Sequence, residues 1–189
     1  MPRASIAAGQ ILHRVHGATV AARWYGRRDG TWRWDDPAGH YGVLYLGRSP
    51  IGPFAETLLR IPAQREILWS NINQKRLAAF EVKRRLHLAD LAGAGVAWFE
   101  TTLARIAEDH DPITRPDAYA LTQAISARVH GTSDLDGILY RSRFDPSELC
   151  IALFARADDA IVLVQEGSPI ERAWARKILN KRGYALLDL

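Results

Sequence analysis

The sequence predicts a single α+β domain whose central sheet is mixed or antiparallel and is flanked by helices. A chain of 189 residues with 48% hydrophobic residues is long enough to bury one core. Short apolar, β-prone runs are intermixed with segments of helical period, and consecutive strand-like runs dominate the C-terminal half. No internal repeat or low-complexity linker interrupts the chain, so residues 1–189 are assigned to one domain.

The first part of the chain is expected to hold two strands and a helix. Residues 11–16, ILHRVH, form the first expected strand, with Arg14 on one face. A polar loop over 17–40 follows and contains a turn at 36–39. Residues 42–46 are expected to form a buried strand, and Gly and Pro residues between 47 and 53 end it. A helix is then expected over 54–59, which places Glu56 near the helix start.

The middle of the chain gives a mixed signal. Residues 64–77 have no clear period, and 77–91 are compatible with a helix by propensity. The apolar positions Val82, Leu86 and Leu88, separated by polar residues, indicate two extended pieces instead. A helix over 96–109 is predicted from apolar residues that recur every three or four positions: Val96, Phe99, Leu103 and Ile106.

The C-terminal part begins with a helix over 118–129, opened by Pro116-Asp117 and closed by Gly131 as a C-cap. A turn at 136–137 precedes a strand over 138–140. The later expected elements are strands over 150–155 and 160–164 joined by a turn at 157–159, a basic amphipathic helix over 171–182, and an edge strand over 184–187.

Composition limits the classes of function. The chain has 25 Lys and Arg against 21 Asp and Glu, a net charge of +4 and a pI near 9.5, which suits an anionic ligand or weak attraction to nucleic acid. Its single cysteine, Cys150, excludes an intrachain disulfide and a cysteine metal cluster, and suits a reducing cytoplasm. The first residues lack a signal-peptide core, and no apolar run approaches the roughly 20 residues that span a bilayer. A cytoplasmic protein without a membrane partner is expected.

The common catalytic and nucleotide-binding motifs are absent. The chain contains no GxxxxGK[ST], GxGxxG, HExxH or GxSxG sequence. Its six histidines are scattered, and only His13 and His16 are close together. Because these two lie three residues apart in an expected strand, their rings face opposite sides. No metal cofactor is therefore expected.

Two clusters of residues remain as candidates for a site. The first consists of Arg33, Tyr45 and Glu56, and the second is the run 140–143, YRSR, with Ser142. Each member also has a structural interpretation: Arg33 as a guanidinium stacked between tryptophans, Tyr45 as a core residue, Glu56 as a favourable charge at a helix N-terminus, and Ser142 as a turn hydroxyl. Order and spacing favour a site.

The order of these blocks resembles the RES-domain family, whose members include the toxins of Xre-RES toxin–antitoxin pairs. The matching pieces run from 11 to about 156: LHRVH, WRWDDPAG, VLYLGRSPIGPFAE, YALTQAISARVHGTSDLDGILYRSRF and CIALF. Glu56 follows Tyr45 by eleven residues, as in the family. One departure is Asp35, where many members have Asn, because it adds a negative charge near a site expected to take an anion.

The resemblance implies a fold similar to ADP-ribosyltransferases and NAD as the substrate, cut at the nicotinamide–ribose bond. This bond needs no general acid, because nicotinamide leaves neutral; it needs stabilisation of an oxocarbenium-like centre. The implied roles are Glu56 at the ribose and the developing charge, Arg33 at the pyrophosphate, Tyr45 beside the nicotinamide, and Ser142 orienting the nicotinamide or ribose. Arg14 is either a second phosphate ligand or part of a structural salt bridge.

The acceptor stays open at this point. Water gives an NAD glycohydrolase, inorganic phosphate a phosphorylase, and a protein side chain an ADP-ribosyltransferase. The resemblance also implies an Xre-type helix-turn-helix antitoxin that covers the cleft. The chain has no such motif itself, so direct DNA binding is not expected without that partner. A basic nucleic-acid-binding or RNA-directed toxin module is the alternative from another class, based on the pI and six tryptophans.

Overall fold

An eight-stranded sheet forms the centre of the computed structural model, which describes residues 1–61, 63–108, 117 and 119–188. The strand order is β1-β6-β7-β8-β3-β2-β5-β9. These strands are β1 (Arg3–Ile6), β2 (Ile11–Gly17), β3 (Val43–Gly47), β5 (Lys75–Val82), β6 (Leu86–Asp90), β7 (Gly137–Arg141), β8 (Leu149–Phe154) and β9 (Ile161–Pro169). Only β6 and β7 run parallel in this sheet, in the described part of the chain. The predicted α+β domain with a mixed sheet is confirmed.

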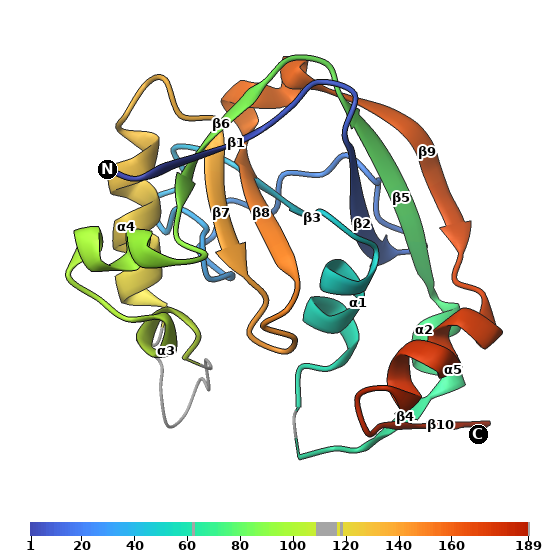
Figure 1. Ribbon diagram of the computed structural model, residues 1–189. Coiled ribbons are helices and arrows are strands. Elements are labelled where there is room, and N and C mark those ends of the chain that lie inside the picture. Colours follow the sequence, from blue (N-terminus) through green and yellow to red (C-terminus); the bar gives the residue numbers. More distant parts are fainter. Residues whose placement is uncertain (62, 109–116, 118, 189) are drawn as a thin grey trace.

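Helices and a small second sheet surround the main sheet (Figure 1). The helical segments are α1 (Ile51–Leu58), α2 (Trp69–Asn73), η1 (Ala94–Phe99), α3 (Leu103–Ile106), α4 (Ala120–His130), η2 (Ala155–Ala160) and α5 (Arg172–Asn180), where η marks a 3-10 helix. The small sheet pairs β4 (Glu66–Leu68) with β10 (Ala185–Leu187) in parallel. None of the helices in the described ranges has the length and apolar character to cross a membrane.

The main sheet is split between β2 and β3. These strands are paired only at His13 and Gly47, whereas β3 pairs along its whole length with β8, and β2 pairs along its whole length with β5. In Figure 1, β3, β8 and β7 lie on one side of the split and β2, β5 and β9 on the other. One apolar cluster contains residues of both halves, including Leu12, Leu44 and Phe80. The two halves therefore share a core while their strands diverge.

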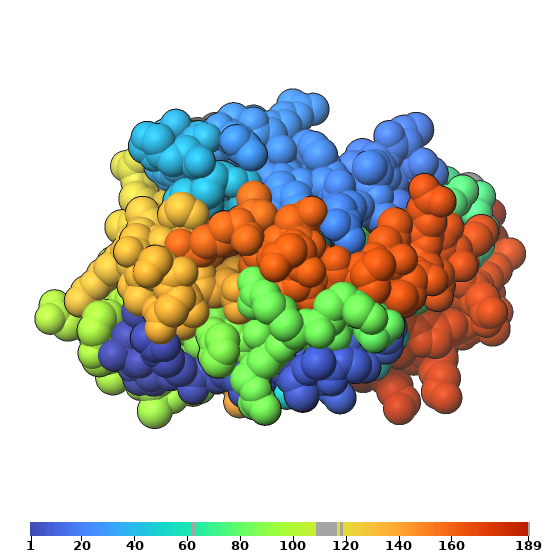
Figure 2. All heavy atoms as spheres, turned by 90° about the horizontal axis from the view of Figure 1, so that it is seen from above, coloured from blue at the N-terminus to red at the C-terminus, as the bar shows by residue number. Residues whose placement is uncertain are grey.

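The upper end of the split is covered. Viewed from the top of Figure 1, orange atoms of η2 and the start of β9 lie between the blue loop after β2 and the green β5–β6 turn (Figure 2). The amide of Lys83 donates to the carbonyl oxygen of Ala160 at 2.8 Å, and Tyr25 Oη donates to Asp158 Oδ1 at 2.8 Å. These contacts close the split between β2 and β3 at this end of the molecule. The side of the split near α1 stays open for a cavity.

Helix α1 begins earlier than the sequence predicts. It starts at Ile51 rather than at residue 54, because Pro53 is tolerated in the first turn and Ser49 Oγ accepts a hydrogen bond from the Ile51 amide. Glu56 therefore lies in the second turn, and its interpretation as an N-terminal charge is wrong. The helix contacts the end of β3 closely, since a Cβ at Gly47 would lie 2.3 Å from Pro53 Cδ.

The predicted helix over 96–109 is broken in two. Glu100 adopts a left-handed conformation with φ of 55°, which ends η1, and Thr102 then caps α3 by accepting a hydrogen bond from the Arg105 amide. The apolar period reflects burial of Val96, Phe99 and Ile106, whereas Leu103 is exposed. Residue 109 lies outside the described residues.

The other elements agree in type with the sequence prediction and differ at their ends. The two extended pieces within 77–91 are β5 and β6. Helix α4 starts at Ala120, and the predicted start at residue 118 and Pro116 lie outside the described residues. Gly131 is the C-cap of α4 but keeps right-handed geometry. The expected edge strand over 184–187 is β10, which pairs with β4 and not with the main sheet. Strands β1 and β4 and helix α2 have no counterpart in the prediction, and the 3-10 helix η2 lies where a turn was predicted.

Candidate active site

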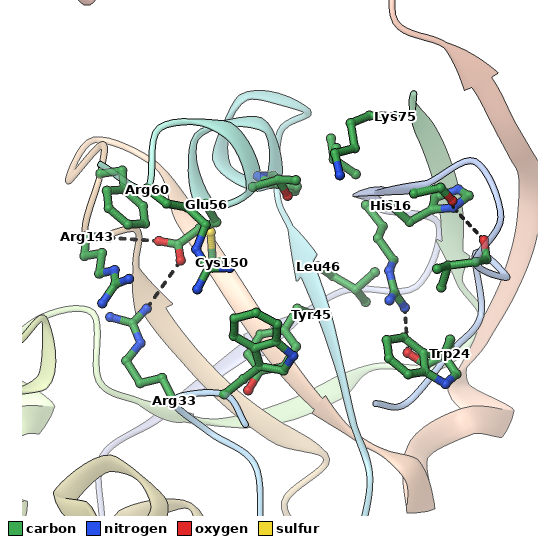
Figure 3. A pocket seen from close by; sticks show the side chains of 18 of the residues that line it. His16, Trp24, Arg33, Tyr45, Leu46, Glu56, Arg60, Lys75, Arg143 and Cys150 are labelled. Carbon is green, nitrogen blue, oxygen red and sulfur yellow. Dashed lines mark hydrogen bonds and ion pairs between the residues drawn. The ribbon is translucent and has the colours of Figure 1, made fainter. Parts of the chain in front are cut away.

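A cavity of about 390 Å³ lies where β2 and β3 diverge. Residues from β2, β3, α1, β8 and the loop after β2 line it, and Figure 3 shows their side chains. Five cations line the cavity: Arg14, Arg33, Arg60, Lys75 and Arg143. Glu56 is the one carboxylate in the lining, as far as the described residues go. The excess of positive charge favours an anionic ligand.

Arg33 extends from the loop before β3 into this cavity. It is buried, with 6% of the residue exposed, so it is not the surface guanidinium of the structural interpretation. Its Nη1 donates to the Ile106 carbonyl oxygen at 3.1 Å, and its guanidinium carbon lies 4.8 Å from the centre of the Tyr140 ring. Burial has the largest single effect and opposes the charge, but the Glu56 carboxylate and the nearby tyrosines together outweigh it and raise the pKa of Arg33. Arg33 is therefore a fixed, permanently charged group.

Glu56 faces Arg33 across the cavity. Its Oε2 lies 3.8 Å from Arg33 Nη2, and its Oε1 accepts a hydrogen bond from the Arg143 amide at 2.9 Å. The side chain is 23% exposed, so a ligand can reach it. One oxygen is held by the backbone, and the other is near a cation but beyond hydrogen-bond distance. That second oxygen is placed to accept a hydrogen bond from a ligand.

Tyr45 presents its ring to the cavity, and its hydroxyl is engaged elsewhere. Tyr45 Oη donates to Asp35 Oδ1 at 2.8 Å and accepts from the Trp34 amide at 3.0 Å. Burial raises the pKa of Tyr45 well above its usual range, so the hydroxyl stays protonated. Tyr45 can therefore offer a ligand the flat face of its ring but no free hydroxyl.

Asp35 lies behind the cavity. Its carboxylate accepts hydrogen bonds from the Tyr45 hydroxyl and, at 3.0 Å, from the Trp32 amide. It therefore joins the turn that carries Arg33 to strand β3. Asp35 is buried and is not part of the cavity lining. The added negative charge thus supports Tyr45 and the turn from behind and does not face a bound anion directly.

Asp35→Asn should change the pH dependence of stability in a defined direction. Burial raises the pKa of Asp35, although hydrogen bonds from Tyr45 and Trp32 oppose this. The folded state therefore binds the proton more tightly than the unfolded state, and this contribution to stability is lost as pH rises through the raised pKa. The stability of the Asn variant relative to wild type should accordingly increase between about pH 4 and pH 7, as measured by urea denaturation.

Asp29→Asn provides the control of opposite sign. Asp29 is exposed, and the hydrogen bond from the Thr31 hydroxyl lowers its pKa. Its stabilising contribution is present above its ordinary pKa and is lost in acid, so the Asn variant should lose relative stability as pH rises. Parallel pH curves for wild type and Asp35→Asn would contradict the assignment.

Ser142 lies beside the cavity, in the turn after β7. Its Oγ is buried and accepts hydrogen bonds from the amides of Phe144 and Asp145, both at 3.3 Å. The intervening Arg143 amide is the donor to Glu56. Ser142 lines a smaller, apolar cavity of about 220 Å³ on the other side of Arg33. The structure thus brings Arg33, Tyr45 and Glu56 together and places Ser142 in the turn that orients Glu56.

Ser142→Ala is expected to lower the free energy of unfolding by about 1 kcal/mol, because two amides of the turn lose their acceptor. Urea denaturation at neutral pH measures this loss. Ser168→Ala is the control, since Ser168 is exposed near the end of β9. An unchanged stability for Ser142→Ala would show that the turn does not depend on the hydroxyl.

Arg14 forms hydrogen bonds to backbone carbonyl oxygens rather than the salt bridge considered in the sequence analysis. Its Nη1 donates to the carbonyl oxygens of Ala22 at 3.0 Å and Trp24 at 2.7 Å. Burial lowers the pKa of Arg14 to about 10. Within the described part of the chain, no carboxylate pairs with it, and its bonds to carbonyls hold the loop after β2 against the strand. His16, its neighbour but one, bonds through Nδ1 to the carbonyl oxygens of Gly17 and Val20.

Several lining residues escaped the sequence analysis. Trp24, Lys75 and Arg60 belong to this group, and Cys150 lines the cavity although only its redox meaning was considered. Arg60 follows Glu56 by four residues, a helical spacing that offered a signal. Trp24 and Lys75 offered no such signal, because Trp24 lies in a loop and Lys75 in a strand that only the fold places at the cavity. In the described ranges, no three His, Cys, Asp or Glu side chains are arranged to hold a metal ion.

Comparison with known proteins identifies the family. The family model described as RES domain matches residues 11–177. A chain in the crystal structure of the M. tuberculosis MbcT–MbcA toxin–antitoxin complex is similar in fold, with a TM-score of 0.66, 15% sequence identity, and coverage of 93% of this chain and 92% of that chain. No match was found among curated proteins. Because the family model spans most of the sequence, the chain belongs to the RES domain family.

Proposed function

We propose that this protein is the toxin of a toxin–antitoxin pair and that it cleaves the nicotinamide–ribose bond of NAD. The observation that carries the proposal is the Glu56 carboxylate, held 3.8 Å from Arg33 at the wall of a cavity that five cations line. NAD brings a pyrophosphate for the cations and a ribose for the carboxylate. Family membership and the fold shared with a chain of a toxin–antitoxin complex support the same proposal.

In the proposed reaction, the bond from the ribose C1′ to the nicotinamide nitrogen breaks. The bonding electrons go to the pyridinium nitrogen, so nicotinamide leaves neutral and positive charge develops on the ribose. Glu56 stabilises that charge and accepts a hydrogen bond from a ribose hydroxyl through Oε2. The Arg143 amide, bonded to Oε1, keeps the carboxylate oriented during the reaction.

The other residues of the cavity bind the substrate, and Cys150 takes no part in the reaction. Arg33 and Arg60 offer guanidinium groups to the pyrophosphate, for which a fork of donors is suited. Tyr45 packs its ring against the nicotinamide. Cys150 does not serve as a nucleophile in this scheme, because burial, with Glu56 adding to the effect, raises the pKa of its thiol well above the usual range.

Incubation of the purified protein with NAD tests the proposal, with nicotinamide measured by chromatography. Release of nicotinamide is expected, and its absence from a folded, antitoxin-free sample would overturn the proposal. The second product assigns the acceptor. ADP-ribose indicates water, ADP-ribose 1″-phosphate indicates inorganic phosphate, and an adduct found by mass spectrometry on cell proteins indicates ADP-ribosylation.

An antitoxin partner follows from the same proposal. The MbcT–MbcA structure is a toxin–antitoxin complex, and we expect this chain to bind an Xre-type antitoxin over its cavity. The nucleic-acid alternative gains little from α5 and the turn after it, because Arg172 and Arg176 share the carboxylate of Asp188 and Arg182 pairs with Asp145. Part of the positive charge in this region is therefore matched.

A further inference from the structure

The cavity has two halves of different chemistry. Glu56 and Arg33 lie on one side of β3, whereas His16, Trp24 and Lys75 lie on the other side (Figure 3). Both groups line one continuous cavity. The second group comes from β2, the loop after it, and the start of β5, which form the other half of the split sheet. A molecule that fills the cavity therefore touches both halves of the sheet.

Trp24 is held at the second half of the cavity with an available face. Arg14 fixes the backbone there, since it donates to the Trp24 carbonyl oxygen at 2.7 Å. The indole is 37% exposed, and no ring or guanidinium of the described residues stacks on it. The other cavity tryptophan, Trp32, is already covered by the guanidinium of Arg60, whose carbon lies 4.4 Å from the ring centre. Trp24 thus offers a flat apolar surface for a ligand ring.

Lys75 adds an uncompensated charge to the half of the cavity that Trp24 lines. It is partly buried at the start of β5, and its ammonium has no carboxylate within 4.0 Å and no hydrogen-bond acceptor in the described part of the chain. An ammonium without a partner at a cavity wall attracts an anionic oxygen. An aromatic face and a separate cation in the same half of a cavity suit a purine nucleotide, which carries a flat base and, some distance from it, a phosphate.

We infer that the Trp24–Lys75 half of the cavity binds the adenosine monophosphate part of a dinucleotide, with the purine against Trp24 and a phosphate oxygen at Lys75. The inference rests on the proposed function, which sets the orientation of the bound dinucleotide. The nicotinamide riboside lies at Glu56, and the pyrophosphate linkage crosses the split between β3 and β2. The consequence is selectivity for dinucleotides over nicotinamide mononucleotide, which lacks the adenosine.

Calorimetric titration with ADP tests the subsite without any turnover. Wild type is expected to bind ADP, and Trp24→Ala and Lys75→Ala are each expected to weaken binding at least about five-fold, the lower range for loss of base stacking or of a phosphate contact. Glu56→Gln should bind ADP no more weakly than wild type. Trp98→Ala and Lys177→Ala are matched controls, because Trp98 is exposed, Lys177 lies on the surface of α5, and neither lines the cavity.

Kinetics give the second test. The ratio of kcat/KM for NAD to kcat/KM for nicotinamide mononucleotide should fall at least about five-fold in Trp24→Ala and Lys75→Ala, and stay constant in both controls. ADP affinity that is equal in wild type and both variants, or an unchanged ratio, would overturn the inference. Weakened ADP binding without nicotinamide release from NAD by wild type would instead overturn the proposed function and leave the nucleotide subsite in place.

Discussion

Glu56→Gln is expected to lower kcat for nicotinamide release from NAD by about 100-fold or more, the range found when a charge-stabilising group is removed from an active site. The amide has nearly the same shape and can still accept the hydrogen bond from the Arg143 amide through its carbonyl oxygen. It carries no negative charge to stabilise the ribose cation. KM should change little, because the carboxylate acts mainly in the transition state.

The control for this prediction is Glu166→Gln, which removes an exposed carboxylate of β9 that is not part of the cavity lining. It should retain wild-type kcat. Thermal denaturation of both variants checks that the fold is intact. A fall of only a few fold in Glu56→Gln would assign Glu56 to the support of Arg33 and would require another source of charge stabilisation.

The half of the cavity that holds Arg33, Tyr45 and Glu56 was within reach of sequence reasoning, and the half that holds Trp24 and Lys75 was not. Arg33, Tyr45 and Glu56 lie in one contiguous block, so their order and spacing carry a signal without knowledge of the fold. Trp24 and Lys75 line the same cavity only because β2 pairs with β5 and diverges from β3. Strand pairing between distant segments depends on packing that periodicity does not encode.

The errors in the predicted elements have local physical causes. The apolar period over 96–106 is real, but the left-handed Glu100 breaks the helix, and nothing about a glutamate signals that conformation. Strand β1 has mostly exposed or half-buried residues, so it lacks the apolar run by which β3 and β8 were predicted. Strand β1 was missed for that reason, whereas β9, an edge strand that is also mostly exposed, was predicted from its apolar run over 160–164.

Arg33→Lys is expected to lower kcat/KM for NAD by about 10- to 100-fold, the cost of a lost hydrogen bond to a charged group. Lysine keeps the charge but offers a single ammonium, whereas Arg33 reaches the Ile106 carbonyl oxygen with Nη1 and the Glu56 side with Nη2. One of these contacts must fail. Arg33→Ala should lose more activity and also lower the free energy of unfolding by about 1–3 kcal/mol, because the buried Ile106 carbonyl loses its donor.

The double variant Arg33→Lys/Glu56→Gln tests whether Arg33 and Glu56 act together on the bound substrate or independently of each other. If both residues act on the same bound dinucleotide, their combined loss in kcat/KM should be smaller than the product of the single losses. Arg128→Lys controls for the loss of a stacked guanidinium, since Arg128 covers Trp98 outside the cavity. Strictly multiplicative losses would mean that Arg33 binds substrate independently of Glu56, and that the 3.8 Å separation between them has no part in the reaction.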